Sequence, residues 1–267
     1  MNRLDGKVAL ISGAARGIGG ETARLMAQAG ASVIVADVLD EQGRQTVGAI
    51  TEAGGQAAYV HLDVTKEEPW VEAINLATSR FGKLDILVNN AGVFIGKGIE
   101  DISLDEWNRL VAVNMTGVFL GTRLAAPALR EAAKSSEHGS AIVNLASIAG
   151  IVGSQLDPLY SMTKGGVTLF TKSAALEFGR KGYRIRVNSI HPGVIQTDMG
   201  EQTFVARAER TGSNDTAAVR QVVTDTVPWG RLGMPMDIAK GIVFLASDDA
   251  GYMNGAGLIV DGGVTAT

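Results

Sequence analysis

Short apolar runs alternate with longer amphipathic stretches from one end of the chain to the other. The apolar runs show little polar alternation, which is typical of strands that are covered on both faces. We expect strands at residues 8–12, 32–37, 56–62, 84–89, 141–146, 185–190 and 258–260. Helical periodicity separates them, near residues 17–29, 40–53, 66–81, 103–133, 159–181 and 235–247.

This alternation predicts the type of sheet. Strands that alternate with helices are joined by right-handed crossovers, which place neighbouring strands parallel to one another. No linker-like tract, low-complexity stretch or tandem repeat divides the 267 residues. The pattern therefore predicts one α/β domain over residues 1–267, built on a parallel sheet.

Residues 198–228 depart from the alternation. Met199 and Phe204 stand there among many polar residues, and Thr211-Gly212-Ser213-Asn214 is a loop signal. A long excursion of this kind is often a lid that binds substrate. An ordinary helical insertion on the surface is the alternative, and the pattern does not decide between the two.

Composition excludes several classes of function. The chain is 46% hydrophobic and 19% charged, with a formal net charge of −4 and no dense Lys/Arg run. Nucleic acid and anionic membranes are therefore not expected as main partners. Because there is no cysteine, disulfides, thiol catalysis and Cys-based zinc sites are excluded. The three histidines are scattered, so we expect no metal, and the lack of a leader pattern or membrane span predicts a cytoplasmic protein.

A glycine-rich turn follows the first expected strand and opens the first expected helix. Gly13 permits a sharp turn, Gly17 lets the backbone approach a pyrophosphate, and Gly19 allows close packing of helix on strand. The helix N-terminus offers free N–H groups to the phosphates. The turn predicts a dinucleotide site at Ser12-Gly13-Ala14-Ala15-Arg16-Gly17-Ile18-Gly19.

Asp37 ends the second expected strand, at about the distance from the glycines where an acidic residue binds the adenosine ribose. Its carboxylate would accept hydrogen bonds from the ribose hydroxyls and would repel a 2′-phosphate. Arg16 favours the opposite choice, because a basic residue in the turn can pair with that phosphate. We let Asp37 decide, since it would oppose the phosphate directly, and we expect NAD rather than NADP.

Tyr160 and Lys164 are the most informative pair in the chain. They stand four residues apart in an expected helix and therefore share one face. A free phenol has a pKa of about 10, and a nearby ammonium would lower this pKa toward neutrality, making the phenol a usable acid and base. Ser147, upstream of the tyrosine, would give a second hydrogen bond to the same substrate oxygen.

With these motifs the chain resembles the short-chain dehydrogenase/reductase family over essentially its whole length. Asp63-Val64 resembles the pair that contacts adenine, and Asn89-Asn90-Ala91-Gly92 resembles a segment beside the cofactor. The segment that holds the nicotinamide carboxamide is similar to Pro192-Gly193, Ile195 and Thr197. The residues that match the catalytic tetrad of the family are Asn114, Ser147, Tyr160 and Lys164.

The resemblance implies a fold, a reaction and an assembly. The implied fold is a single-domain Rossmann fold, a doubly wound seven-stranded parallel sheet with helices on both faces. The implied reaction is hydride transfer with NAD, in which Tyr160 is the acid and base, Ser147 orients the substrate and Lys164 also binds the nicotinamide ribose. Asn114 would hold a water that links Lys164 to solvent. Family members are commonly homotetramers, with residues 103–133 and 159–181 as candidate contact helices.

Within the family, the chain looks most like bacterial NAD-linked cyclic alcohol and hydroxysteroid dehydrogenases. We see no Arg or Lys aimed at a substrate carboxylate, so the expected substrate is an uncharged, hydrophobic secondary alcohol or ketone. The expected pocket residues are Phe94, Ile148, Ala149, Leu156, Met199 and Phe204. A 3-oxoacyl-thioester reductase of the same fold is the enzyme alternative. A non-catalytic, dinucleotide-sensing binding protein is the alternative of another class.

Overall fold

The computed structural model describes residues 3–154, 156–213 and 215–266. Within these ranges one parallel sheet has the strand order β3-β2-β1-β4-β5-β6-β7. The predicted seven-stranded parallel sheet is therefore confirmed. Its strands are β1 (Val8–Ser12), β2 (Ser32–Asp37), β3 (Gln56–His61), β4 (Ile86–Asn89), β5 (Ser140–Leu145), β6 (Ile185–Pro192) and β7 (Gly257–Val260).

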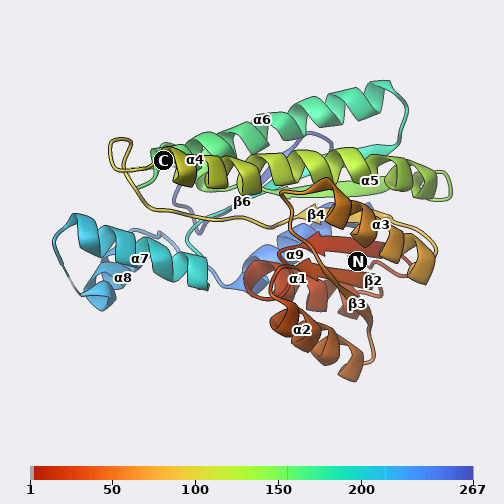
Figure 1. Ribbon diagram of the computed structural model, residues 1–267, viewed down its shortest axis with the longest axis horizontal. Helices are drawn as coiled ribbons and strands as arrows, with labels where there is room; N and C mark the ends of the chain where they lie inside the picture. Colours follow the sequence, from red (N-terminus) through yellow and green to blue (C-terminus); the bar gives the residue numbers. More distant parts are fainter. Residues whose placement is uncertain (1–2, 155, 214, 267) are drawn as a thin grey trace.

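Helices cover both faces of this sheet, as the doubly wound Rossmann fold requires (Figure 1). One core cluster lies beneath α3 (Glu67–Phe81), α5 (Gly117–Ala133) and α6 (Pro158–Arg180). A second cluster lies on the opposite face, beneath α1 (Gly17–Gln28), α2 (Asp40–Glu52) and α9 (Pro235–Ala246). The strands are buried from both sides, which explains why their sequences lack polar alternation.

The helical segment expected at residues 103–133 is continuous but not uniform. It consists of α4 (Leu104–Val111), a π-helical turn η1 (Ala112–Thr116) and α5. By length and composition alone, Leu104–Ala133 could cross a membrane, but half of its apolar window is buried inside the domain. We therefore assign it as a core helix of this domain.

Residues 198–228 form two helices, α7 (Asp198–Arg210) and α8 (Thr216–Asp225), which pack against each other. Figure 1 shows this pair standing at one end of the molecule, outside the two layers that cover the sheet. The predicted loop signal falls between them, where Ser213 is described and Asn214 lies outside the described residues. The excursion is thus helical.

The edges of several strands differ from prediction by one or two residues. Strand β4 begins at Ile86 rather than at Leu84, because the Asp85 side chain itself accepts the backbone N–H of Val8 at 2.8 Å. Strand β6 continues to Pro192, since it pairs with β7 as far as Val260. These differences arise from pairing partners, which the sequence pattern does not contain.

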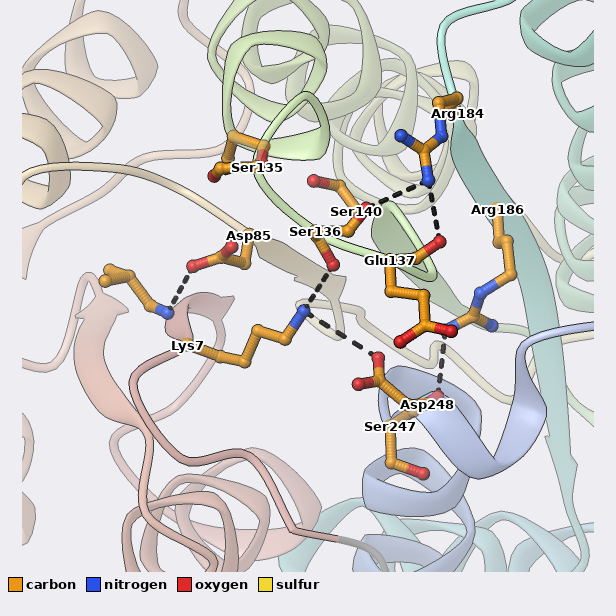
Figure 2. A network of polar contacts seen from close by, with 12 residues as sticks. Lys7, Asp85, Ser135, Ser136, Glu137, Ser140, Arg184, Arg186, Ser247 and Asp248 are labelled. Carbon is orange, nitrogen blue, oxygen red and sulfur yellow. Dashed lines mark hydrogen bonds and ion pairs between the residues drawn. The ribbon is translucent and has the colours of Figure 1, made fainter.

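A polar network closes the amino-terminal edge of the sheet, away from the carboxyl ends of the strands (Figure 2). Lys7 Nζ donates to Ser136 Oγ at 2.8 Å and lies 3.7 Å from a carboxylate oxygen of Asp248. Arg186, 7% exposed on β6, donates to the carbonyls of Leu245 and Ser247 at 2.9 and 3.0 Å. These bonds satisfy carbonyls at the C-terminus of α9 and tie that helix to the sheet.

The carboxyl ends of the strands are left for the site. Strands β1 and β4 are neighbours in the sheet, and the chain winds outward from them in both directions. In open α/β sheets a ligand crevice forms at this reversal of strand order, outside the carboxyl ends. The fold therefore places the glycine-rich turn after β1 beside the segment that follows β4.

Candidate active site

The turn between β1 and α1 depends on close approaches of backbone. Gly13 has φ +65°, and a Cβ there would lie 2.8 Å from the Cα of Ala91. A Cβ on Gly19 would lie 2.1 Å from the carbonyl oxygen of Gly13. Gly17 has φ +59°, which glycine adopts without strain. Side chains at Gly13 and Gly19 would displace the turn, whereas one at Gly17 would have space but would strain the backbone.

Polar side chains from the neighbouring strands hold this turn. Asn90 Nδ2 donates to the carbonyls of Ser12 and Gly13 at 2.9 and 2.8 Å. In return, Ser12 Oγ accepts the backbone N–H groups of Asn90 and Ala91 at 3.1 and 3.2 Å. The turn and the segment after β4 therefore form one rigid wall of the crevice.

The N-terminus of α1 carries no side-chain cap and no acidic residue in its first turn. A helix end of this kind binds anions, because its first N–H groups lack acceptors and the helix dipole favours negative charge. Arg16, at the N-cap position, forms an ion pair with Asp198, the first residue of α7. The glycine-rich turn is thus linked directly to the excursion at 198–228.

Asp37 lies at the carboxyl end of β2 and is 8% exposed. One carboxylate oxygen accepts the N–H of Ala15 at 2.9 Å, and the other accepts the N–H of Leu39 at 3.1 Å. Each oxygen has a second acceptor position, so the carboxylate can still accept from ligand hydroxyls. Asp37 does not cap α2, whose N-cap residue is Leu39.

Asp63 and Val64 follow β3. One oxygen of Asp63 accepts the backbone N–H and the hydroxyl of Thr65 at 3.0 and 2.7 Å. These bonds are the main cause that lowers the pKa of Asp63, and a contact with Lys66 adds to them. Val64 is buried, and its carbonyl accepts the indole N–H of Trp70 at 3.1 Å. The pair is therefore held in a fixed turn.

The N-terminus of α6 positions Tyr160 and Lys164. Asp157 caps this helix by accepting the N–H of Tyr160 at 2.8 Å, and Pro158 occupies the first turn. Lys164 is 3% exposed, and its Nζ donates to the carbonyl of Leu145 at 2.7 Å. That Nζ lies 5.6 Å from the centroid of the Tyr160 ring. The predicted helical pair is therefore present, with the ammonium over the ring.

Ser147 lies just beyond β5 and completes the group. Its side chain forms a hydrogen bond with Tyr160, and its Oγ also accepts the N–H of Ala149 at 3.1 Å. The carbonyl of Ser147 is 3.1 Å from Nδ1 of His191, whose Nε2 is 2.9 Å from Ser189 Oγ. His191 thus supports the backbone of Ser147 from β6 and takes no part in a hydrolase-like triad.

The electrostatics of the pair differ from expectation. Burial raises the pKa of Tyr160 to about 12; the hydrogen bond with Ser147 opposes this rise, and the charge of Asp157 adds to it. Burial also lowers the pKa of Lys164 to about 8. The expected lowering of the phenol pKa is therefore reversed, because loss of hydration outweighs the hydrogen bond with Ser147.

Asn114 lies in the π-helical turn η1 and is fully buried. Its amide exchanges two hydrogen bonds with the backbone of Val93, at 2.8 and 2.9 Å, and donates to Thr163 Oγ1 at 3.3 Å. A Cβ on Gly92 would lie 3.5 Å from Asn114 Oδ1 and 3.6 Å from Lys164 Nζ. The absence of a side chain at Gly92 therefore keeps these two polar atoms facing a common space.

Asp157 has a second role that the sequence did not suggest. It is fully buried, and its other oxygen accepts the N–H groups of Ile95 and Gly96 at 3.3 and 2.9 Å. This fixes the segment in which Phe94 makes an edge-to-face contact with Tyr160, with 5.5 Å between ring centroids. One carboxylate thus ties α6 to a wall of the site.

These elements surround a cavity of about 380 Å³. It brings together Ser147 and part of the predicted cofactor set, namely Ile18, Asn90, Gly92, Tyr160, Lys164, Pro192, Gly193, Ile195 and Thr197. Of the predicted pocket residues, it is lined by Phe94, Ile148, Ala149, Leu156 and Met199. The remaining predicted residues lie outside the lining, in the glycine-rich turn, after the ends of the strands β2 to β4 or in η1. They are Ser12, Gly13, Arg16, Gly17, Gly19, Asp37, Asp63, Val64, Ala91 and Asn114.

Phe204 is placed differently from expectation. It is 1% exposed and packs in a separate cluster with Val223, Val227 and Leu232, so it joins α7 to α8 instead of lining the cavity. The apolar character that suggested a pocket residue serves the packing of the excursion. A different face of α7 lines the cavity.

Arg207 is a lining residue that sequence reasoning missed. Met199, Thr203 and Arg207 all line the cavity, and they stand four residues apart along α7. This spacing places them on one helical face and was a usable signal. It was overlooked because the region was not assigned to a helix.

Comparison with known proteins agrees with this geometry. Residues 13–265 match a family model described as Enoyl-(Acyl carrier protein) reductase. The chain is 42% identical to a trans-4-hydroxycyclohexanecarboxylate dehydrogenase of Sinomonas cyclohexanicum, covering 99% of this chain and 95% of that protein. It is also 42% identical to a 3-alpha-(or 20-beta)-hydroxysteroid dehydrogenase of Mycobacterium bovis, covering 99% and 91%.

A solved structure gives the same result for the fold. The crystal structure of levodione reductase matches with a TM-score of 0.91 at 31% identity, covering 99% of this chain and 100% of that one. Both the sequence relatives and this structure extend over nearly the whole chain, including the glycine-rich turn, α6 and α7. The chain therefore belongs to the short-chain dehydrogenase/reductase family.

Proposed function

We propose that this protein is an NAD(H)-dependent oxidoreductase that interconverts a hydrophobic secondary alcohol, whether cyclic, aryl or steroid-like, and its ketone. The observation that carries the proposal is the meeting of Ser147, Tyr160 and Lys164 in one cavity at the carboxyl ends of the strands. Family membership supports the reaction class, since the relatives are named as dehydrogenases of a cyclic hydroxy acid and of hydroxysteroids.

The crevice fits a nicotinamide dinucleotide, the type of cofactor that this family uses. The turn leaves no room for a Cβ at Gly13 or Gly19, and the uncapped N-terminus of α1 suits a pyrophosphate. Asp37 and Asp63-Val64 would hold the adenosine end. The remaining holding residues would be Ser12, Arg16, Gly17, Ile18, Asn90, Ala91, Gly92, Tyr160, Lys164, Pro192, Gly193, Ile195 and Thr197.

Two observations support NAD over NADP as the cofactor. The Asp37 carboxylate is fixed at the end of β2, where it would face a 2′-phosphate. Arg16, which could have paired with that phosphate, is engaged by Asp198. The local charge therefore favours the unphosphorylated ribose.

A bound nicotinamide would supply the hydride chemistry, and in this proposal the residues of the protein handle the proton. Tyr160 gives its phenolic proton to the carbonyl oxygen during reduction and takes a proton from the hydroxyl during oxidation. Ser147 donates a hydrogen bond to the same oxygen and orients it. Lys164 carries a positive charge below its pKa of about 8, and this charge stabilises the phenolate form of Tyr160.

Asn114 supports proton exchange with solvent in this proposal. Its Oδ1 and the Nζ of Lys164 face the space beside Gly92 that a Cβ would occupy. A water held between two such polar groups links the lysine to the exterior as a relay. The hydrogen bonds to Val93 keep the amide fixed, so the structural role and the relay role coexist.

The walls of the cavity support an apolar substrate body. Phe94, Ile148, Ala149, Leu156 and Met199 contribute mostly apolar surface near the catalytic group. We assign α7 and α8 as the substrate-binding lid over residues 198–228, since α7 provides part of the lining. The names of the relatives support ring-shaped alcohols as substrates.

Two alternatives make different predictions. A 3-oxoacyl-thioester reductase is the enzyme alternative, and the description of the matching family model names the same class of acyl-carrier-protein substrate, although it names an enoyl group in place of the 3-oxo group. A ketone panel that includes an acyl-thioester separates the two enzyme candidates by kcat/KM. A dinucleotide-sensing binding protein would bind NADH but reduce no member of the panel.

We also propose a homotetramer and a cytoplasmic location. Met162, Leu169 and Leu176 form a stripe at seven-residue spacing along α6, and each is at least 60% exposed. Phe119 on α5 is 46% exposed and borders an apolar groove of about 330 Å³ between α5 and α6. Such a face is typical of a contact between subunits.

Cell fractionation tests the proposed cytoplasmic location.

Replacing Tyr160 with Phe removes the proton donor while keeping the ring. We expect Tyr160→Phe to fold and to bind NADH, with kcat lowered by about 10²- to 10⁴-fold. Steady-state kinetics with cyclic ketones measure the loss, and NADH fluorescence titration with thermal unfolding provides the control. Activity within a fewfold of wild type would remove Tyr160 from the proposed role.

The cofactor preference is measured as kcat/KM for NADH and for NADPH with the same ketone. We expect NADH to be favoured by about tenfold or more, because Asp37 opposes the 2′-phosphate. Asp37→Asn keeps the size of the side chain and should narrow the preference, whereas Arg16→Met should not reverse it. A clear preference for NADPH in the wild type would contradict this assignment.

Because the pKa of Tyr160 is raised, its phenol is protonated near neutrality and serves as a proton donor. Reduction should therefore proceed at neutral pH, whereas the rate of oxidation should rise with pH as phenolate forms. Asp157→Asn removes a negative charge near the phenol and should shift the oxidation profile to lower pH by roughly one unit. Lys164 is the other charged residue facing the phenol and is unchanged in this variant.

The control for this profile is Asp105→Asn, which removes the same charge from an exposed position on α4. It should leave the oxidation profile in place. A profile of Asp157→Asn that stays fixed, or moves to higher pH, would show that Asp157 does not influence the Tyr160 proton.

The assembly is tested by light scattering in solution. We expect a mass of about four times the 27.8 kDa of one chain. Leu169→Asp places a charge in the apolar stripe on α6 and should dissociate the assembly, whereas Leu104→Asp changes an exposed residue outside that stripe. A monomeric wild type would contradict the tetramer.

A further inference from the structure

Helix α7 presents one polar and partly charged face to the cavity. Met199, Thr203 and Arg207 line it at four-residue spacing, and Arg207 is the most distant of the three from the start of the helix. With a rise of 1.5 Å per residue, Arg207 lies about 14 Å along the axis from Asp198. The guanidinium is therefore carried well away from the glycine-rich turn at which α7 begins.

Contacts of α7 with other parts of the site show toward which end Arg207 lies. A Cβ on Gly96 would approach the side chain of Ala206 to 2.8 Å, so the turn that carries Arg207 packs on the segment after β4. In that segment Phe94 contacts the ring of Tyr160. Arg207 therefore belongs to the substrate end of the cavity and not to its phosphate end.

The charge of the cavity is one-sided. Among the described residues that line it, Lys164 and Arg207 are charged, and none is acidic. Lys164 is committed to the carbonyl of Leu145 and to the catalytic tyrosine. Arg207 is thus the cation of the lining that is available to a ligand.

Arg207 also differs from its neighbours in lacking a carboxylate partner. Arg16 pairs with Asp198 and Arg220 pairs with Glu201, so two acidic residues of α7 are used by other arginines. In the described part of the chain, no carboxylate lies within 4.0 Å of Arg207. The lining thus includes a guanidinium fork that has no carboxylate partner among the described residues.

Partial burial of this guanidinium has an energetic consequence. Desolvation lowers the pKa of Arg207, although a guanidinium stays protonated in proteins. A partly desolvated charge without a partner is unfavourable, and a carboxylate that supplies two parallel hydrogen bonds removes that penalty. Arg207 remains exposed as a residue, so it lies at the mouth of the cavity and is reachable by a ligand from solvent.

We propose that Arg207 binds a carboxylate on the substrate, and that the natural substrate is a ring alcohol or ketone whose acid group lies remote from the reacting carbon. This inference rests on the proposed dehydrogenase function and narrows its substrate class. The apolar walls hold the ring, Tyr160 and Ser147 hold the reacting oxygen, and Arg207 holds the opposite end. It differs from the expectation that no Arg or Lys is aimed at a substrate carboxylate, because Arg207 lines the cavity.

The test compares two substrates that differ only in charge, 4-oxocyclohexanecarboxylate and 4-oxocyclohexanecarboxamide, with NADH. We expect the wild type to favour the carboxylate in kcat/KM by about 10- to 100-fold, mainly through KM. Arg207→Met should abolish this preference, and Arg207→Lys should keep part of it, because lysine retains the charge but not the fork. Arg210→Met, on the same helix but outside the lining, should retain the full preference.

The outcomes separate this inference from the function on which it rests. A wild type that reduces both substrates equally well overturns the role of Arg207 and leaves the dehydrogenase assignment standing. If neither ketone is reduced, the dehydrogenase proposal loses its support, and calorimetric titration with cyclohexanecarboxylate then decides the role of Arg207. Binding by the wild type that Arg207→Met loses supports the carboxylate site, whereas equal binding or none overturns it.

Discussion

The close approach of two backbone segments at the reversal of strand order is the constraint on which this structure depends. The turn after β1 folds back so tightly that a Cβ on Gly19 would overlap the carbonyl of Gly13, and Gly13 in turn abuts Ala91 after β4. Asn90 stabilises this contact by donating hydrogen bonds to the carbonyls of Ser12 and Gly13 in the turn. Because the sheet extends outward from β1 and β4, the positions of the remaining loops at the carboxyl edge follow from this contact.

A second constraint comes from charges that are held in the interior. Asp157 caps α6 and anchors the backbone at Ile95 and Gly96, so removing it would loosen two walls of the cavity at once. The same negative charge makes Tyr160 harder to ionise, and burial acts in the same direction. The site therefore combines a rigid frame with a phenol that is poised to donate a proton, which suits carbonyl reduction near neutrality.

The substrate side is built separately from this frame. Helix α7 is joined to the glycine-rich turn by the Arg16–Asp198 pair and to the segment after β4 by the contact between Ala206 and Gly96. The glycine-rich turn and the segment after β4 are thus connected to each other through one helix. One face of that helix lines the cavity with Met199, Thr203 and Arg207, while the buried face with Phe204 holds α7 on α8.

Local pattern determined much of this protein. The apolar runs predicted the strands, the glycines predicted the turn, and the spacing of Tyr160 and Lys164 predicted a shared helical face, because these features depend on neighbours in the sequence. The start of β4 at Ile86, the placement of Phe204 in the cluster that joins α7 to α8 and the position of Arg207 at the cavity required the tertiary structure. So did the direction of the Tyr160 pKa, since hydration is lost only when distant segments close around a side chain.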